Sequence, residues 1–225
     1  MAMGTDQGCV GAGRDVGRGL FVVFEGGDGA GKSTQVARLV EALSARGERV
    51  VATREPGGTA VGAQIRQVLL HGQEVAPAAE ALLFAADRAQ HVQTVIRPAL
   101  AAGAVVVCDR YVDSTFAYQG ARDDLDVEDL RGLVAYATGG LVPDVTVLLD
   151  VSAQVGAARL GGDRDRIEAE PDSFHQAVRD GFLERARCAP QRYLVLDAAA
   201  PVDEIADAVL GRVESLLGER RGERG

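Results

Sequence analysis

A glycine-rich segment near the start of the chain has the residue types and spacing of a phosphate-binding loop. Gly26 is followed, after four residues, by Gly31, Lys32 and Ser33. Glycines let the backbone curl so that successive N–H groups point at phosphate oxygens, while a lysine holds the β and γ phosphates and a serine hydroxyl ligates Mg²⁺. All but one of the 24 basic residues are arginine, and the exception is Lys32. This argues against the alternative of an ordinary glycine-rich turn.

Two further groups of polar residues follow apolar runs. Asp109 and Arg110 come directly after the run at residues 105–108, where a carboxylate could hold Mg²⁺ and a guanidinium could neutralise phosphate charge. A structural Asp-Arg surface pair is the alternative. Phe84 and Arg88 are four residues apart on a predicted helix and so share a face, ready to stack on a base and to bind a phosphate or base edge. Spacing alone favours the alternative, a core Phe84 with a solvated Arg88.

Five short apolar runs must position these groups. They lie at residues 20–24, 50–53, 104–108, 145–149 and 193–196, with helical sequence between them. Such alternation predicts an α/β fold with a five-stranded parallel sheet flanked by helices in three layers, and ligands at the carboxyl ends of the strands. We expect one domain over residues 19–217, a disordered extension at 1–18 and a mobile tail at 218–225.

Composition limits the function classes. The formal net charge of −9 disfavours a surface for nucleic acid. No apolar run approaches the length of about 20 residues that spans a membrane. The widely separated Cys9, Cys108 and Cys188 lack the spacing of a metal site or disulfide framework, which favours the cytoplasm. The three histidines at positions 71, 91 and 175 give no site signal.

Together, three motifs resemble the thymidylate kinase family of P-loop nucleoside monophosphate kinases, from about residue 19 to 215. The motifs are EGGDGAGKST at residues 25–34, REPGGT at 54–59 and DRYVDSTFAYQG at 109–120. Other P-loop kinases share the first motif but not the set. The resemblance implies a P-loop NTPase fold with a short lid at about residues 159–170, ATP and Mg²⁺ as donor and cofactor, small nucleotides as partners, and a homodimer formed through helices that include residues 78–100.

The resemblance also implies roles for individual residues. Asp28 would act where the two phosphates meet, and Arg110 would contact the acceptor phosphate. Phe84 would stack on thymine and Arg88 would contact the base, which reverses the expectation from spacing. Tyr118 would occupy the place of a ribose 2′-hydroxyl and so favour deoxyribose. The other expected contacts are Gly26, Gly27, Gly29, Ala30, Gly31, Lys32, Ser33 and Thr34 for ATP, Arg54, Glu55, Thr115 and Gln119 for the acceptor, and Ser33 and Asp109 for the metal.

The lid carries the remaining catalytic candidates. Some members of the family place a catalytic arginine in the P-loop, but Gly29 stands there, so we expect Arg164 and Arg166 to supply positive charge from the lid. Lid-type members often carry an arginine where this chain has Gly161, which leaves open whether Arg159, Arg164 or Arg166 reaches the transferred group. The alternative is an exposed charged loop with internal ion pairs. Residues 197–200 resemble the loop that borders the donor adenine.

The implied activity is transfer of the ATP γ-phosphoryl group to dTMP. Two other functions stay open at this point. One is a P-loop kinase for another nucleotide or a deoxynucleoside, and the other is a nucleotide-binding protein without catalysis.

Overall fold

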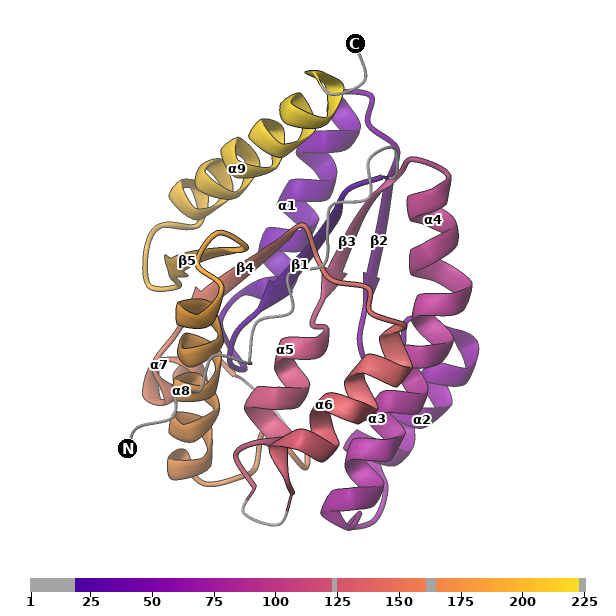
Figure 1. Ribbon diagram of the computed structural model, residues 1–225. Coiled ribbons are helices and arrows are strands. Elements are labelled where there is room, and N and C mark those ends of the chain that lie inside the picture. The colour runs from indigo at the N-terminus through magenta and orange to yellow at the C-terminus, as the bar shows by residue number, and fades with distance from the viewer. Residues whose placement is uncertain (1–18, 123–124, 161–164, 223–225) are drawn as a thin grey trace, which may run out of the picture.

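A parallel sheet runs through the centre of the computed structural model, which describes residues 19–122, 125–160 and 165–222 (Figure 1). The strand order is β2-β3-β1-β4-β5. The strands are β1 (Phe21–Glu25), β2 (Val50–Arg54), β3 (Val105–Asp109), β4 (Val145–Asp150) and β5 (Tyr193–Asp197). Every predicted apolar run forms one of these strands, so the predicted five-stranded α/β architecture is confirmed. The expected extension at residues 1–18 lies outside the described residues.

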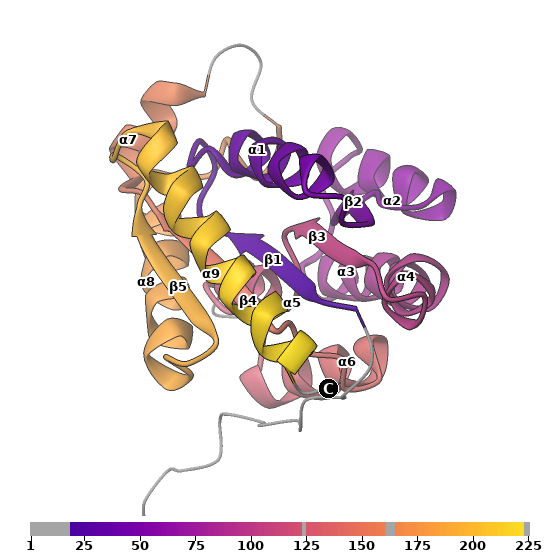
Figure 2. The same cartoon turned by 90° about the horizontal axis from the view of Figure 1, so that it is seen from above.

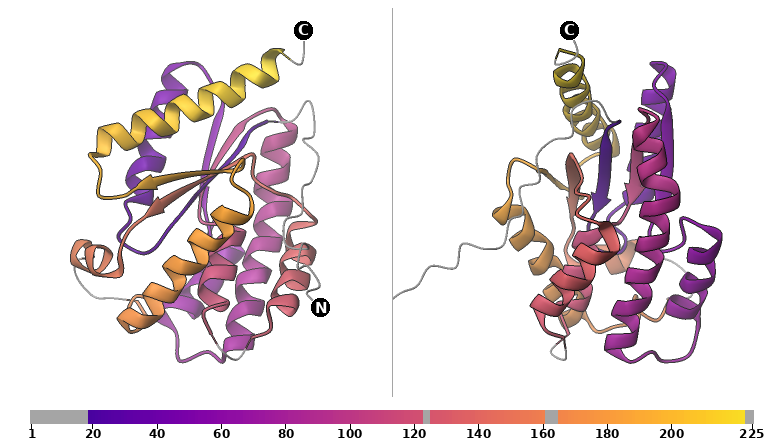
Figure 3. Two further views of the ribbon diagram at one scale, coloured as in Figure 1. Left: turned by 60° about the vertical axis from the view of Figure 1, so that its left-hand side comes forward. Right: turned by 45° about the vertical axis from the view of Figure 1, so that its right-hand side comes forward.

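Helices connect consecutive strands and cover both faces of the sheet. They are α1 (Lys32–Ala45), α2 (Ala60–His71), α3 (Pro77–His91), η1 (Val92–Ile96), α4 (Arg97–Ala101), α5 (Val112–Ser114), η2 (Thr115–Gln119), α6 (Val127–Thr138), α7 (Ala153–Arg159), α8 (Asp172–Cys188) and α9 (Val202–Gly222). Figure 3 shows α8 and α9 on opposite sides of β4 and β5. The result is three layers.

The pleat of β1 divides its side chains between two cores. Phe24 faces the layer of α1 and α9, where it joins a buried cluster with Leu43 and Val209. Phe21 faces the other layer and packs in a cluster with Ile96. Figure 2 shows the sheet lying between α1 on one side and α3, α4 and α6 on the other. Because β1 is buried on both faces, its sequence reads as a continuous apolar run.

The last helix extends beyond the predicted end of the domain. Helix α9 continues to Gly222, whereas we expected a mobile tail from residue 218. Two arginines near its end hold it to the body of the protein. Arg220 Nη2 lies 2.6 Å from Asp144 Oδ1, and Arg221 pairs with Glu48. The sequence pattern shows neither partner, because both lie far away in the chain.

Candidate active site

The phosphate-binding loop joins β1 to α1 at the carboxyl edge of the sheet. Gly26 and Gly29 have φ angles of 137° and 75°. A Cβ atom at Gly26 would lie 2.3 Å from the carbonyl oxygen of Leu149, and one at Gly29 would lie 2.3 Å from that of Gly156. Both positions therefore require glycine. The loop leads into the N-terminus of α1, whose first N–H groups have no partner within the helix and favour an anion.

Lys32 lies within the curl of this loop. Its side chain is buried, and its Nζ donates to the carbonyl oxygens of Gly26 and Gly27 at 3.0 and 2.8 Å. Burial and the nearby charge of Arg110 lower the pKa of Lys32 to about 8, against the opposing effect of Asp28. A phosphate bound beside the ammonium would favour its charged form.

Ser33 and Asp109 form the candidate magnesium position. Ser33 Oγ donates to Asp109 Oδ2 at 3.0 Å, and Asp109 ends β3, the neighbour of β1. A hydroxyl and a carboxylate are hard oxygen ligands, and Mg²⁺ is commonly held by one or two protein groups together with substrate phosphates. The two residues fit this mode. Within the described part of the chain, no group of three or more Asp, Glu, His or Cys side chains could hold a metal by itself.

Asp28 and Arg110 form an ion pair across the loop. Arg110 Nη2 lies 2.5 Å from Asp28 Oδ1, and the Tyr118 hydroxyl donates to Asp28 Oδ2 at 2.9 Å. Burial raises the pKa of Asp28, but the charges of Arg110 and Lys32 outweigh burial and lower it. Asp28 is therefore a carboxylate. Arg110 also has a φ of 70°, and such strain at a non-glycine residue is common at functional sites.

Two pockets meet at this ion pair. The larger, with an empty volume of about 1500 Å³, lies over the phosphate-binding loop and extends to Ala198 and Ala200, as expected for a loop bordering a donor base. The smaller has about 650 Å³ and lies between α2, α3 and η2. A few residues line both pockets: Asp28, Glu55, Arg66, Arg110 and Glu168. The arrangement can hold two ligands whose ends face each other at Asp28 and Arg110.

The smaller pocket contains most of the expected acceptor residues. It is lined by Phe84, Arg88, Thr115, Tyr118 and Gln119. Arg88 is only 2% exposed, so the alternative of a solvated Arg88 is wrong. Arg54 differs, because it lines the larger pocket.

Every nitrogen of the Arg88 guanidinium has a partner. Nε donates to Glu55 Oε2 at 2.7 Å, Nη1 to Thr115 Oγ1 at 2.6 Å, and Nη2 to the carbonyl oxygen of Tyr111 at 2.8 Å. Burial lowers the pKa of Arg88, and the charge of Glu55 more than offsets this and raises it. The guanidinium is therefore fixed in place before a ligand arrives.

Glu55 is held from a second side by His91, a residue that sequence reasoning set aside. His91 is fully buried, with Nδ1 at 2.9 Å from Glu55 Oε1 and Nε2 at 2.6 Å from Thr53 Oγ1. Its position one turn after Arg88 on α3 is the feature of the sequence that could have indicated a place near the site. Glu55 thus orients Arg88, and His91 orients Glu55.

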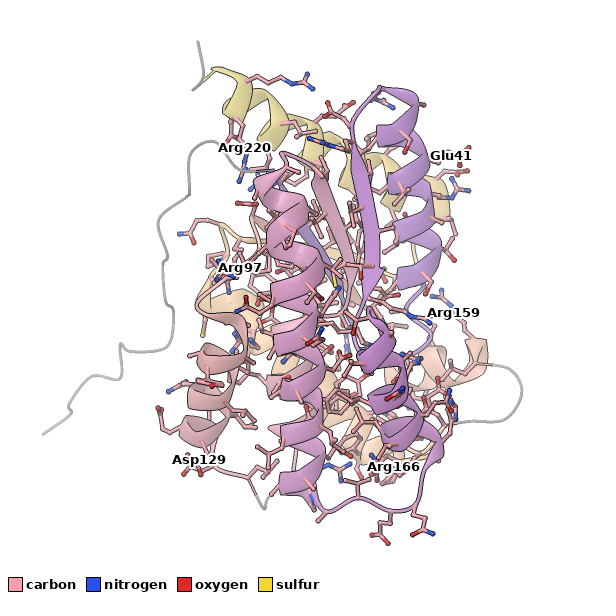
Figure 4. All side chains as sticks on the ribbon, turned by 90° about the vertical axis from the view of Figure 1, so that its right-hand side faces the viewer. Glu41, Arg97, Asp129, Arg159, Arg166 and Arg220 are labelled. Carbon is pink, nitrogen blue, oxygen red and sulfur yellow. The ribbon has the colours of Figure 1, made fainter. Side chains whose placement is uncertain are left out.

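Of the lid arginines considered, Arg159 and Arg166 lie in different parts of the structure. Arg164 is outside the described residues. Arg166 donates to the Leu69 carbonyl oxygen at 3.1 Å and pairs with Glu80, so it lies beside α2 and not at the phosphate-binding loop. Arg159 lines the larger pocket and donates to the Ala198 carbonyl oxygen at 2.9 Å. Figure 4 labels both, with Arg159 near the start of α1 and Arg166 beside α2.

Arg66 is a site residue that sequence reasoning missed. It lines both pockets, and its Nη1 donates to the Pro56 carbonyl oxygen at 3.0 Å. Burial and the nearby charge of Arg54 lower its pKa. Nothing in its spacing on α2 distinguishes it from a surface arginine, because its proximity to the site follows from the packing of α2 beside α3.

None of the helices in the described ranges is both long enough and apolar enough to cross a membrane.

Known proteins match the chain along most of its length. The thymidylate kinase family profile matches residues 24–209. A thymidylate kinase of Clavibacter michiganensis subsp. michiganensis is 52% identical over 203 residues, which cover 88% of this chain and 96% of that protein. A thymidylate kinase of Leifsonia xyli subsp. xyli is 54% identical over 200 residues, with coverages of 87% and 95%. One of a Synechococcus species is 50% identical over 198 residues, with 88% and 96%. The chain therefore belongs to the thymidylate kinase family.

Proposed function

We propose that this chain transfers the γ-phosphoryl group of ATP to dTMP, giving dTDP and ADP. The meeting of the two pockets at Asp28 and Arg110 is the observation that carries the proposal. ATP would occupy the pocket over the phosphate-binding loop, and dTMP the pocket beside Phe84. An oxygen of the dTMP phosphate attacks the γ-phosphorus as the bond from that phosphorus to the bridging oxygen breaks, and ADP leaves with the bond's electrons.

Positioning and charge supply most of the catalysis in this scheme. The dTMP phosphate is already anionic, so no general base is needed. Lys32 holds the donor phosphates, and Arg110 holds the acceptor phosphate beside them. Mg²⁺, when held by Ser33 and Asp109, would neutralise charge on the donor phosphates. Arg159 is the described lid arginine that we assign to the transferred group, because it lines the pocket over the phosphate-binding loop whereas Arg166 is engaged by Glu80. The role expected of Arg164 stays a prediction.

Side chains in the acceptor pocket would choose the nucleotide. Phe84 would stack on the base, and the fixed guanidinium of Arg88 would meet its edge. Tyr118 is 6% exposed and is held by its bond to Asp28, so its ring would exclude a 2′-hydroxyl.

We also infer a cytoplasmic homodimer formed through residues 78–100 and neighbouring helices. Exposed apolar side chains on α3 and α6 support it: Leu82 is 58% exposed and Tyr136 is 88% exposed. Light scattering after size exclusion would test the stoichiometry.

The function is tested by ADP release from ATP and Mg²⁺ with each nucleoside monophosphate in turn. We expect turnover with dTMP, weaker turnover with dUMP, and dTDP as the product in a phosphorus NMR spectrum. Turnover confined to another acceptor would refute the assignment of dTMP as the acceptor. ATP binding without turnover on any acceptor would refute the proposal that the chain is a catalyst.

A further inference from the structure

Glu80 is a buried carboxylate that the reaction scheme does not use. It lies in the first turn of α3 and is 1% exposed. Arg166 pairs with its Oε2, and Arg122 Nε lies 3.4 Å from its Oε1. The carboxylate thus forms ion pairs with two arginines, and a carboxylate in an ion pair can only accept hydrogen bonds.

The same carboxylate contacts a residue of the acceptor pocket. Gln119 is 2% exposed, lines that pocket, and donates from Nε2 to Glu80 Oε1 at 3.0 Å. A flipped amide would place its carbonyl oxygen against the anion, which is repulsive, so the anion fixes which end of the amide faces it. Among the described residues, none donates to Gln119 Oε1. The free acceptor of this amide is therefore the atom left for a ligand.

We propose that Glu80 is a positioning residue for base selection, because it fixes the Gln119 amide with Oε1 toward the bound base. The inference rests on the proposed function and names the part of the pocket that reads the base. Glu80 itself does not touch the nucleotide and acts only through Gln119.

The hydrogen-bonding edges of the pyrimidines show why the orientation matters. Thymine presents an N3–H donor beside the O4 acceptor, whereas cytosine presents an N3 acceptor beside an N4 amino donor. Gln119 Oε1 would accept from thymine N3–H, and the guanidinium of Arg88 would donate to O4. Cytosine would place an acceptor against Oε1 and a donor against the guanidinium. With the amide reversed, Gln119 Nε2 would donate to cytosine N3. The orientation of the amide therefore decides whether thymine or cytosine is preferred.

The test is the ratio of kcat/KM for dTMP to that for dCMP in full-length wild type and in Glu80→Gln. A glutamine at position 80 can donate as well as accept, so it no longer forces the Gln119 amide into one orientation. We expect the ratio to fall by at least about tenfold, chiefly through a higher KM for dTMP. A ligand whose polar group meets a mismatched partner in a buried pocket binds much more weakly. In a Gln119→Leu background, Glu80→Gln should leave the ratio unchanged, since the amide is gone.

Arg122→Gln is the matched control. It removes one ion partner of Glu80 but keeps the bond from Gln119, so the ratio should stay within about twofold of wild type. If Glu80→Gln does not fold, Glu80→Asp keeps the charge and withdraws it from Gln119 by one methylene, with the same expected loss of selectivity.

Proportional losses with both acceptors and an unchanged ratio in the folded variant would overturn the proposal and leave Glu80 with a structural role. A wild type that does not phosphorylate dTMP at all would instead refute the proposed function.

Discussion

The two pockets share the Asp28–Arg110 pair but are lined by different kinds of groups. The larger pocket, over the phosphate-binding loop, is called the donor pocket here, and the smaller one, beside Phe84, the acceptor pocket. The donor pocket is formed by backbone at glycines, by Lys32, and at its far end by small apolar residues such as Ala198 and Ala200. The acceptor pocket has less than half its empty volume, about 650 against 1500 Å³, and several of its polar side chains are buried and hydrogen-bonded to other buried side chains. Arg88 and Gln119 line this pocket, and each is hydrogen-bonded to a buried glutamate.

This difference predicts different kinds of recognition. Phosphates on a helix N-terminus are held by charge and by N–H groups that any nucleoside triphosphate can satisfy. Directional side-chain bonds in a small pocket discriminate between ligands that differ by one group. Selectivity should therefore reside in the acceptor pocket, and affinity for phosphates in the donor pocket.

The largest expected effect lies on the donor side. Lys32→Ala removes the only lysine from the loop, and we expect kcat to fall by at least about 10³-fold, because charge on the phosphates is no longer offset. The melting temperature should stay near that of wild type. Turnover within tenfold of wild type in the steady-state assay would refute the role of the loop.

Removing the central cation of the acceptor network should affect stability as well as binding. Arg88→Ala leaves Glu55 buried without its guanidinium partner, which costs about 3–5 kcal/mol of unfolding free energy. Urea unfolding measures the loss, and KM for dTMP should rise in parallel. Arg38→Ala, which breaks an exposed pair with Asp203 between α1 and α9, should cost no more than about 1 kcal/mol. Equal losses in the two variants would contradict the difference expected between the buried acceptor network and an exposed ion pair.

A pH effect on stability should come from Glu25, the last residue of β1. Burial and the charge of Asp113 raise the pKa of Glu25 from 4.5 to about 7. The unfolded chain releases this proton at lower pH than the folded protein does, so stability falls as pH rises from about 4.5 to about 7. Glu25→Gln lacks this dependence. Relative to wild type, the variant should gain on the order of 2 kcal/mol between pH 5 and pH 8 in urea unfolding. Parallel pH profiles of the two proteins would show that Glu25 is not the group responsible.

The smallest effect concerns the sugar. Tyr118→Ala opens the space that the ring fills, and the preference for dTMP over its ribose counterpart should fall about tenfold in kcat/KM. Tyr118→Phe keeps the ring and loses only the bond to Asp28, so the sugar preference should persist. Equal sugar preference in wild type and the alanine variant would assign the exclusion to another residue.

The donor pocket could be predicted from the sequence more fully than the acceptor pocket. The phosphate-binding loop is contiguous, and Asp109 is placed by the end of its own strand, so motif and strand positions locate both. The resemblance to a family supplied Phe84 and Arg88, which spacing alone left in doubt. Arg66 and Glu80 gave no signal, and the position of His91 one turn after Arg88 was the one indication for that residue. The partners of all three are separated from them by at least ten residues and meet them only when the helices pack.

The most direct test of the account is a grid of kcat/KM values with ATP, GTP and CTP as donors and dTMP, dUMP, dCMP and dGMP as acceptors. The two-pocket account predicts a spread of about tenfold or less across the donors and of about 10³-fold or more across the acceptors, with dTMP highest. A wide spread across donors with a narrow one across acceptors would contradict it, because selectivity would then lie in the pocket built from backbone and alanine.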